Sequence, residues 1–382
     1  MWSPQRYRNN GYDQGFDAET VDRAAAAIDT FLITNPKLPA LLTLGHLARR
    51  VDISYLSLRR MVMGPRWDRY TYFRIRKRSG GRRLISVPEH RLMAVQRWIA
   101  SHILSQLPVH PASFAFAPNS SIFRCAEMHC GARWLIKLDI SGFFGSISEI
   151  QVYRVFLNAG YAPLVAFELA RLCTHAPSQS ARYQRVEWRA HRCWKYTIGF
   201  YRQQDLGFLP QGAPTSPMLS NLVMTGMDRL LAALAVKEGL TYTRYSDDIT
   251  FSTTGNYDRQ RAVEVIQMTT RLLGQIGLKV NDRKTRIVPP GARKVVLGLL
   301  VDGPEPNLSR DFRDRLRQHL HYIEKLGPEA HQAARGFDTI SGLYRHVRGL
   351  IDFAKSVDAE YAAAMRDRFD AINWSLDMPK NQ

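Results

Sequence analysis

The segment TYTRYSDDITFS, residues 241–252, predicts two short strands around a tight turn at Ser246, Asp247 and Asp248. Apolar and β-branched residues flank the turn on both sides, as they do in half-buried strands. Adjacent carboxylates at a turn repel each other and raise each other's pKa unless a cation is present. A divalent metal ion would remove this conflict, although an isolated Asp-Asp pair is more often only a polar turn.

A third carboxylate, Asp139, ends the apolar segment RWLIKLDI, residues 133–140, which predicts a buried strand. Mg²⁺ takes oxygen ligands and keeps positions open for substrate phosphates. Two such ions about 3.5–4 Å apart can activate an attacking hydroxyl and stabilise a leaving pyrophosphate. Asp139, Asp247 and Asp248 are therefore candidate ligands of two Mg²⁺ ions.

The chain is strongly basic, with 53 Lys and Arg against 34 Asp and Glu in 382 residues, which points to a polyanionic partner such as nucleic acid. Residues 59–97 hold twelve Lys and Arg and two acids, so +10 of the +19 lies there. Within them, YTYFRIRKRSGGRRLISVP predicts a hairpin that turns at Gly80-Gly81, with cations on the face opposite the core. A merely solvated hairpin is disfavoured, because so many like charges repel one another without an anion.

Two further segments each allow two interpretations. Residues 182–202 interleave six Lys and Arg with aromatic rings, which suits single-stranded nucleic acid or an ordinary strand pair equally well. Residues 40–63 resemble a helix-turn-helix, although a helical hairpin packed on the next domain is favoured. The alternation of strands and helices elsewhere predicts an α+β or mixed α/β core with helical pieces at both ends.

The cysteines favour a reducing cytoplasm, because none of the four stands in a CxxC pair. No run of about 18 apolar residues is present and no signal-peptide pattern opens the chain, so a cytoplasmic protein without membrane contact is expected. A metal site was weighed for Cys125, His129, Cys130, Cys173 and His175. Their spacings match no standard zinc pattern, which favours buried free cysteines.

The order of the motifs resembles that of the bacterial reverse transcriptases, and among them the retron reverse transcriptases. Six blocks carry the resemblance: YFRIRKRSGGRRLISVP, LDISGFFGSI, LPQGAPTSPMLSN, YSDD, GLKVNDRKTRI and VVLGLLV. The resemblance implies an α+β right-hand polymerase with an N-terminal helical extension. Its predicted parts are the extension (1–64), fingers and palm with an antiparallel sheet (65–303), and a helical thumb (304–382). A basic aromatic insertion near 178–205 would contact the cognate RNA or an effector.

The resemblance also implies residue roles. Asp139 and Asp247 would bridge both metals, and Asp248 would complete the site. Phe144, five residues after Asp139, would lie under the sugar and exclude a 2′-OH by steric clash. Lys284 would protonate the leaving pyrophosphate, with a surface lysine as the alternative.

Further residues of the matching blocks would bind the nucleotide. Gln211 and Gly212 would lie against the incoming nucleotide and the template base, where a glycine lets the backbone approach closely. The fingers cations that would hold the triphosphate are Lys77, Arg82 and Arg83.

A retron enzyme copies part of a structured non-coding RNA into DNA. It starts from an internal 2′-OH of that RNA, makes a branched RNA–DNA product, uses dNTPs, and commonly works with an effector protein of its operon in anti-phage defence. Two elements depart from the retron pattern: Ala162 replaces a usual His, and Val296-Leu297-Gly298 replaces Val-Thr-Gly. The alternatives are another defence-associated reverse transcriptase without a branched product, or a non-catalytic nucleic-acid-binding protein.

Overall fold

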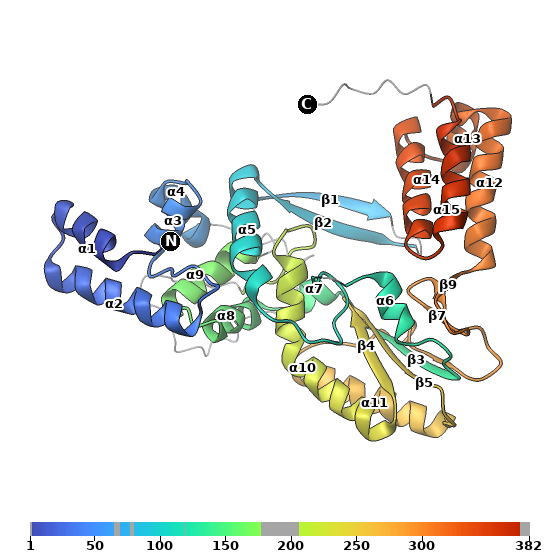
Figure 1. The fold of residues 1–382 in the computed structure, drawn as a ribbon, viewed down its shortest axis with the longest axis horizontal. Coiled ribbons are helices and arrows are strands. Elements are labelled where there is room, and N and C mark those ends of the chain that lie inside the picture. Colours follow the sequence, from blue (N-terminus) through green and yellow to red (C-terminus); the bar gives the residue numbers. More distant parts are fainter. Residues whose placement is uncertain (1, 65–68, 77–79, 119, 177–205, 375–382) are drawn as a thin grey trace.

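The computed structural model describes residues 2–64, 69–76, 80–118, 120–176 and 206–374 (Figure 1). At its centre lies a four-stranded antiparallel sheet with the strand order β4-β5-β3-β6. Its strands are β3 (Trp134–Asp139), β4 (Thr241–Tyr245), β5 (Asp248–Thr253) and β6 (Arg286–Val288). Both strands predicted around the 246–248 turn and the strand predicted before Asp139 are therefore confirmed.

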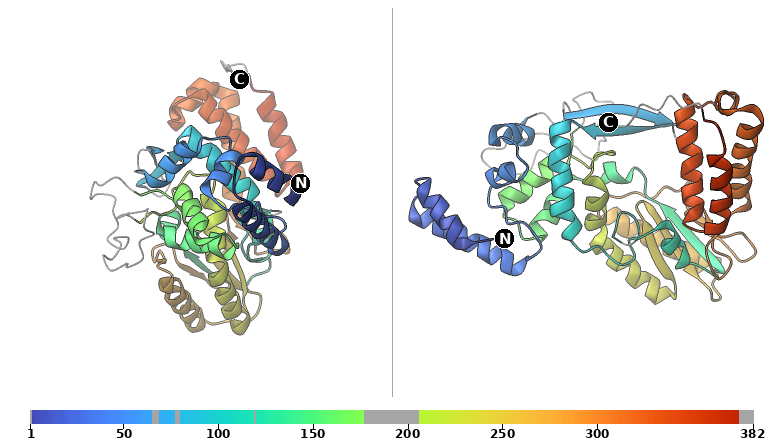
Figure 2. Two further views of the ribbon diagram at one scale, coloured as in Figure 1. Left: turned by 90° about the vertical axis from the view of Figure 1, so that its left-hand side faces the viewer. Right: turned by 45° about the horizontal axis from the view of Figure 1, so that its top comes forward.

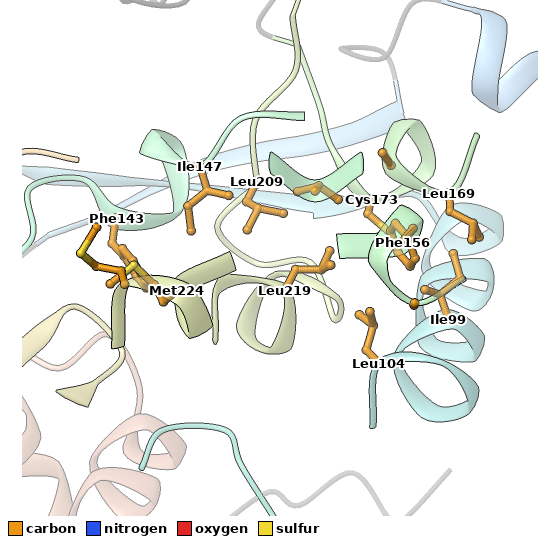
Figure 3. Packing of buried hydrophobic residues seen from close by; sticks show 14 of the residues in the cluster. Ile99, Leu104, Phe143, Ile147, Phe156, Leu169, Cys173, Leu209, Leu219 and Met224 are labelled. Atoms are coloured by element: carbon orange, nitrogen blue, oxygen red, sulfur yellow. The ribbon is translucent and has the colours of Figure 1, made fainter. Parts of the chain in front are cut away.

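Helices cover this sheet and join it to the N-terminal part of the chain. Figure 1 shows α10 (Ser216–Glu238) and α11 (Arg259–Gln275) together along the sheet. Next to them lie α5 (His90–His102), α8 (Glu149–Asn158) and α9 (Pro163–Cys173). In Figure 3, Ile147 and Leu209 pack beside Leu219 of α10, and Phe156 lies beside Cys173 and Leu169. Through Ile147 and Leu209, this core attaches the segments that carry candidate site residues to the helices beside the sheet.

Among the described residues, α10 is the one helix long and apolar enough to cross a membrane. Nine of its side chains are buried inside the protein, including Leu219, Met224 and Leu231. A core helix of a soluble protein has the same length and composition. The contacts of α10 with α8, α11 and β4 are those of such a core helix.

The N-terminal residues form four helices, in agreement with the predicted helical extension. They are α1 (Pro4–Asp13), α2 (Ala18–Thr34), α3 (Leu44–Arg50) and α4 (Tyr55–Met63), each capped by a Ser, Thr or Asp side chain. The predicted break falls at Asp52, whose φ is 53°. The apolar face of α4 packs on α9, and Arg171 Nε donates to the Val62 carbonyl oxygen at 2.7 Å. The packed helical hairpin was therefore the better interpretation.

A two-stranded hairpin of β1 (Tyr70–Arg76) and β2 (Arg82–Pro88) extends from the α5 region toward the C-terminal helices (Figures 1 and 2). Gly80 and Gly81 have φ values of 83° and 78°, so the turn lies where the sequence predicted it. Three arginines, Arg74, Arg76 and Arg82, share one face as expected, whereas Arg83 lies on the other face. The residues of β1 after Tyr70 are all exposed, and strand alternation separates Arg83 from the other three arginines.

A second hydrophobic core lies mostly in the C-terminal part, on a small sheet and four helices, and it reaches the central sheet through Ala126, Ala132 and Leu135. The sheet consists of β7 (Val295–Val296), β8 (Leu299–Leu300) and β9 (Asn307–Leu308). The helices are α12 (Arg310–Leu326), α13 (Pro328–Arg335), α14 (Ile340–Lys355) and α15 (Ala359–Asp370). The α+β class and the helical C-terminal part agree with the sequence, while the division at residues 64 and 303 stays a prediction.

Three histidines from three of these helices meet inside the C-terminal bundle. His319 Nδ1 and His331 Nε2 share a hydrogen bond at 3.0 Å, and the His346 ring lies 5.3 Å from that of His319. Burial lowers the pKa of His319 to about 4, and His331, His346, Arg335 and Arg315 lower it further. The folded bundle therefore holds His319 neutral at pH 7.

We expect the unfolding free energy to fall by about 2 kcal/mol as the pH drops from about 6.5 to 4. Over this interval the unfolded state protonates His319 first, so the contribution is complete above pH 6.5 and is lost toward the folded pKa of about 4. Urea titrations of wild type and His319→Gln at several pH values measure it. An equal pH dependence in both proteins would contradict this assignment.

Candidate active site

The three predicted aspartates come together at one end of the central sheet. The register pairs Asp139, the last residue of β3, with Asp248, the first residue of β5, so both side chains leave the same face. Asp247 precedes β5 in the turn, and its carbonyl oxygen accepts a hydrogen bond from Ile140 N at 2.9 Å. Asp139 is close enough to Asp247 and Asp248 to raise the pKa of both. The structure therefore assembles the predicted carboxylate cluster.

The pKa values of two of these aspartates, Asp247 and Asp248, are raised chiefly by burial. Burial raises the pKa of Asp248 to about 6, helped by the negative charges of Asp247 and Asp139 and opposed by Lys137 and Lys284. Burial also raises the pKa of Asp247, with a further contribution from Asp139, while Lys284 and Arg83 act in the opposite direction. Ionised carboxylates here lack sufficient positive charge around them. A bound cation would supply it.

Lys284 lies directly on this cluster. Its Nζ donates to Asp139 Oδ2 at 2.6 Å, and this hydrogen bond raises the pKa of the lysine. Asn281 binds the same aspartate twice, through Nδ2 to Oδ1 at 3.2 Å and through its backbone N to the carbonyl oxygen at 2.7 Å. The sequence analysis did not select Asn281. Lys284 is thus a counterion of Asp139 here, and its role as an acid stays a prediction.

The donor set fits a divalent metal in its chemistry. All three side chains offer hard carboxylate oxygens, the ligands that Mg²⁺ prefers. The raised pKa values of Asp247 and Asp248 indicate that these two lack nearby positive charge. Within the described residues no three His, Cys, Asp or Glu side chains already converge on one ion position. Asp139, Asp247 and Asp248 would hold the metal once Lys284 shares or yields its oxygen of Asp139.

A buried arginine that the sequence analysis missed supports the aspartate turn. Arg244 on β4 is completely buried, and its Nη1 donates to the Ser246 carbonyl oxygen at 3.0 Å. Its guanidinium also binds both Asp228 carboxylate oxygens of α10, each at 2.7 Å. Ser246 has a φ of 59°, which non-glycine residues rarely adopt. The Arg244–Asp228 pair therefore stabilises a strained turn through the Ser246 carbonyl oxygen.

Ser113 and Asn221 complete the network around this pair. Arg244 Nη2 donates to Ser113 Oγ at 3.1 Å, and Arg244 Nη1 donates to Asn221 Oδ1 at 3.1 Å. A sequence signal existed, since Arg244 is a charged residue inside a strand otherwise predicted to be buried. Its partners come from other segments, so the pattern could not identify them.

Phe144 lies on the short helix α7 (Phe143–Ser146), which follows β3 and stands beside the aspartates. The left-handed Gly142, with a φ of 57°, turns the chain from strand to helix. Phe143 is buried in the core, whereas Phe144 is only partly buried and packs against it at 5.7 Å between ring centroids. The geometry thus leaves part of the Phe144 ring exposed, and its contact with a sugar stays a prediction.

Gln211 and Gly212 form a turn that contacts the hairpin. Gln211 O accepts from Ser86 N at 2.8 Å, and Ser216 Oγ fixes the turn by donating to Pro210 O at 2.7 Å. Gly212 has a φ of 123°, and a Cβ there would lie 3.0 Å from both Ile85 Cγ2 and Ser86 O. The observed reason for a glycine is therefore the close approach of β2. A nucleotide contact at this turn stays a prediction.

The structure does not bring Arg82 and Arg83 to one face. They are neighbours on a strand, so their side chains point to opposite sides. Arg83 shares its face with Ile85, which contacts the Gly212 turn, and the positive charge of Arg83 lowers the pKa of Asp247. Arg83 thus faces the aspartates and Arg82 faces away. Lys77 and the basic aromatic segments at 178–205 lie outside the described residues.

The cysteines and histidines weighed for zinc have other partners. Cys125, Cys130 and Cys173 are free thiols in the described part of the chain. His129 is bonded on both ring nitrogens, to Ser252 Oγ at 2.6 Å and to Thr243 Oγ1 at 2.7 Å. The interpretation as buried or partly buried free cysteines is confirmed for these three.

Comparisons with known proteins identify a family model and several similar proteins. The family model described as reverse transcriptase (RNA-dependent DNA polymerase) matches residues 75–298. The retron Mx65 reverse transcriptase of Myxococcus xanthus is 36% identical over 301 residues, 78% of this chain, which spans 64% of that protein. The retron Ec86 reverse transcriptase of Escherichia coli is 28% identical over 340 residues, 88% of this chain and 92% of that protein. A solved telomerase of Candida albicans matches with a TM-score of 0.43 and 12% identity, over 79% of this chain and 56% of that one.

Proposed function

Since the chain belongs to the reverse transcriptase family, with a right-hand polymerase fold, we propose that it is the RNA-directed DNA polymerase of a retron. It copies part of a structured non-coding RNA into DNA, starting from a 2′-OH of that RNA, and leaves a branched RNA–DNA product. Its partners are this RNA, the DNA product, dNTPs and an effector protein, and it acts in the cytoplasm in anti-phage defence. The resemblance to the Mx65 and Ec86 enzymes supports the retron assignment.

The observation that carries the polymerase proposal is the pairing of Asp139 with Asp248 beside Asp247. Two Mg²⁺ ions held by these carboxylates would supply the positive charge that nucleotidyl transfer requires. Arg83, on the hairpin face toward Asp247, holds the triphosphate. Lys284 Nζ, already within the cluster, gives its proton to the leaving pyrophosphate.

The test is extension of a DNA primer on an RNA template by the purified protein, with dNTPs and Mg²⁺. We expect full-length DNA that disappears when EDTA removes the metal. A protein that binds the primer–template but never extends it, at any divalent metal concentration, would contradict the proposal and favour the non-catalytic alternative.

Replacing Phe144 with Ala should relax sugar selection, because the exposed part of the ring then no longer excludes a 2′-OH. We expect the ratio of kcat/KM for dCTP to that for CTP to fall by roughly 100-fold, since a lost steric clash is worth about 1–3 kcal/mol. Single-nucleotide incorporation measures the ratio. Phe143→Leu, a change in the buried neighbour, is the control and should keep the ratio. An unchanged ratio in Phe144→Ala would remove the ring from sugar selection.

A further inference from the structure

The β1–β2 hairpin presents two faces with different surroundings. In an antiparallel pair, residues directly opposite each other share a face, as do residues two apart on a strand. One face therefore carries Ile75, Arg83 and Ile85. Its base contacts the Gly212 turn, and the charge of Arg83 lowers the pKa of Asp247. We call the other side the outer face. Its members toward the tip are Arg74, Arg76 and Arg82.

The outer face is covered at its base and open at its tip. At the base, Tyr72 stacks on the His175 ring, with 6.0 Å between centroids, and its hydroxyl lies 3.3 Å from His175 Nδ1. Toward the tip, Arg74, Arg76 and Arg82 are exposed and line, with Gly81, an open cavity of about 540 Å³. Figure 1 shows the central sheet on one side of the hairpin only.

Two arginines of this outer face, Arg76 and Arg82, repel each other across the strand pair. Arg76 stands directly opposite Arg82, and Arg74 is two residues along the same strand. Like charges directly opposite each other destabilise a strand pair, and residues 70–88 contain no Asp or Glu. A polyanion laid across the three guanidiniums offsets this repulsion, because each fork can bind phosphate oxygens in pairs.

We propose that the outer face binds the phosphate backbone of RNA outside the catalytic cleft. The inference rests on the proposed function, because it assigns this surface to RNA that the polymerase carries beyond the paired template. Guanidiniums two residues apart on an extended strand form a row along it, which suits a run of backbone phosphates. Arg83 on the inner face serves the triphosphate, so the hairpin separates the two anions by strand alternation.

The experiment uses the full chain and two fluorescent probes. One is a short RNA–DNA primer–template with a two-base overhang, and the other carries a 25-base single-stranded RNA overhang. Arg74→Ala/Arg76→Ala is compared with Arg259→Ala/Arg271→Ala, which removes the same charge from the exposed side of α11. Melting temperatures establish that both variants fold, and Arg74→Lys/Arg76→Lys tests whether charge alone suffices.

We expect Arg74→Ala/Arg76→Ala to weaken binding of the long-overhang probe by roughly tenfold and to reduce the salt slope by about 1.5. Binding of the short probe and the KM for dTTP should match those of the α11 control. A raised KM for dTTP would assign the outer face to the nucleotide and overturn the proposal. Equal binding of the long probe by both double variants would also overturn it. Because binding is measured without synthesis, an inactive wild type would refute the proposed function and leave this result readable.

Discussion

Asp247→Asn lowers kcat for primer extension by about a thousandfold or more while leaving RNA binding intact, because the site then lacks a charged metal ligand. The reason lies in the geometry: Asp247 stands beside the Asp139–Asp248 pair, and Asn keeps its shape but not its charge. The same result is expected for Asp139→Asn. Extension on an RNA template, followed in single-turnover conditions, measures the loss.

The stability of Asp247→Asn should not fall with its activity. Burial raises the pKa of Asp247 and that of Asp248, the latter to about 6, so both ionised carboxylates destabilise the metal-free protein at pH 7. Without divalent ions, the free energy of unfolding of Asp247→Asn should therefore exceed that of the wild type by about 1 kcal/mol. Urea denaturation measures this difference. Asp282→Asn, an exposed change in the neighbouring turn, is the matched control and should alter neither property. Retained synthesis in Asp247→Asn would contradict the assignment of the site.

Arg244→Met should unfold more easily by about 3–5 kcal/mol, because the fully buried Asp228 is left without its cation. Activity should also fall by roughly 100-fold in the protein that remains folded, because the Ser246 carbonyl loses the donor that holds the turn. Urea denaturation and kcat on the folded fraction measure the two effects.

Two further variants separate charge burial from turn geometry. Arg244→Met/Asp228→Leu removes both buried charges and should recover part of the stability without recovering the activity. Arg261→Met breaks an exposed ion pair with Glu238 at 2.9 Å and should lose less than about 1 kcal/mol. If Arg244→Met were as stable and as active as Arg261→Met, the buried network would have no part in holding the turn.

The acidic part of the site could be predicted because each of its residues lies in a segment with a clear local pattern. Asp247 and Asp248 occupy a turn between two short alternating strands, and Asp139 ends an apolar one. The hairpin turn was equally visible, since two consecutive glycines interrupt a basic and apolar alternation. Motif order then linked these segments, and the resemblance supplied the functional roles that spacing alone does not give.

What the sequence could not show depends on contacts between distant segments. Arg244 binds Asp228 and Ser113, and Lys284 binds Asp139, only because the sheet and α10 bring these residues together. The opposite directions of Arg82 and Arg83 follow from the strand register, which a basic stretch does not reveal by composition. Gly212 was predicted to contact the nucleotide, whereas in the structure its nearest neighbours are Ile85 and Ser86 of β2.

The most direct measurement is to express the protein with its flanking genomic DNA and to sequence the nucleic acid that co-purifies, beside an Asp247→Asn/Asp248→Asn control. We predict a discrete DNA joined to a structured RNA through a 2′–5′ linkage, present with the wild type and absent from the control. DNA without that linkage would keep the polymerase and contradict the retron assignment. Absence of DNA from both samples would contradict the proposal that this chain is an RNA-directed DNA polymerase.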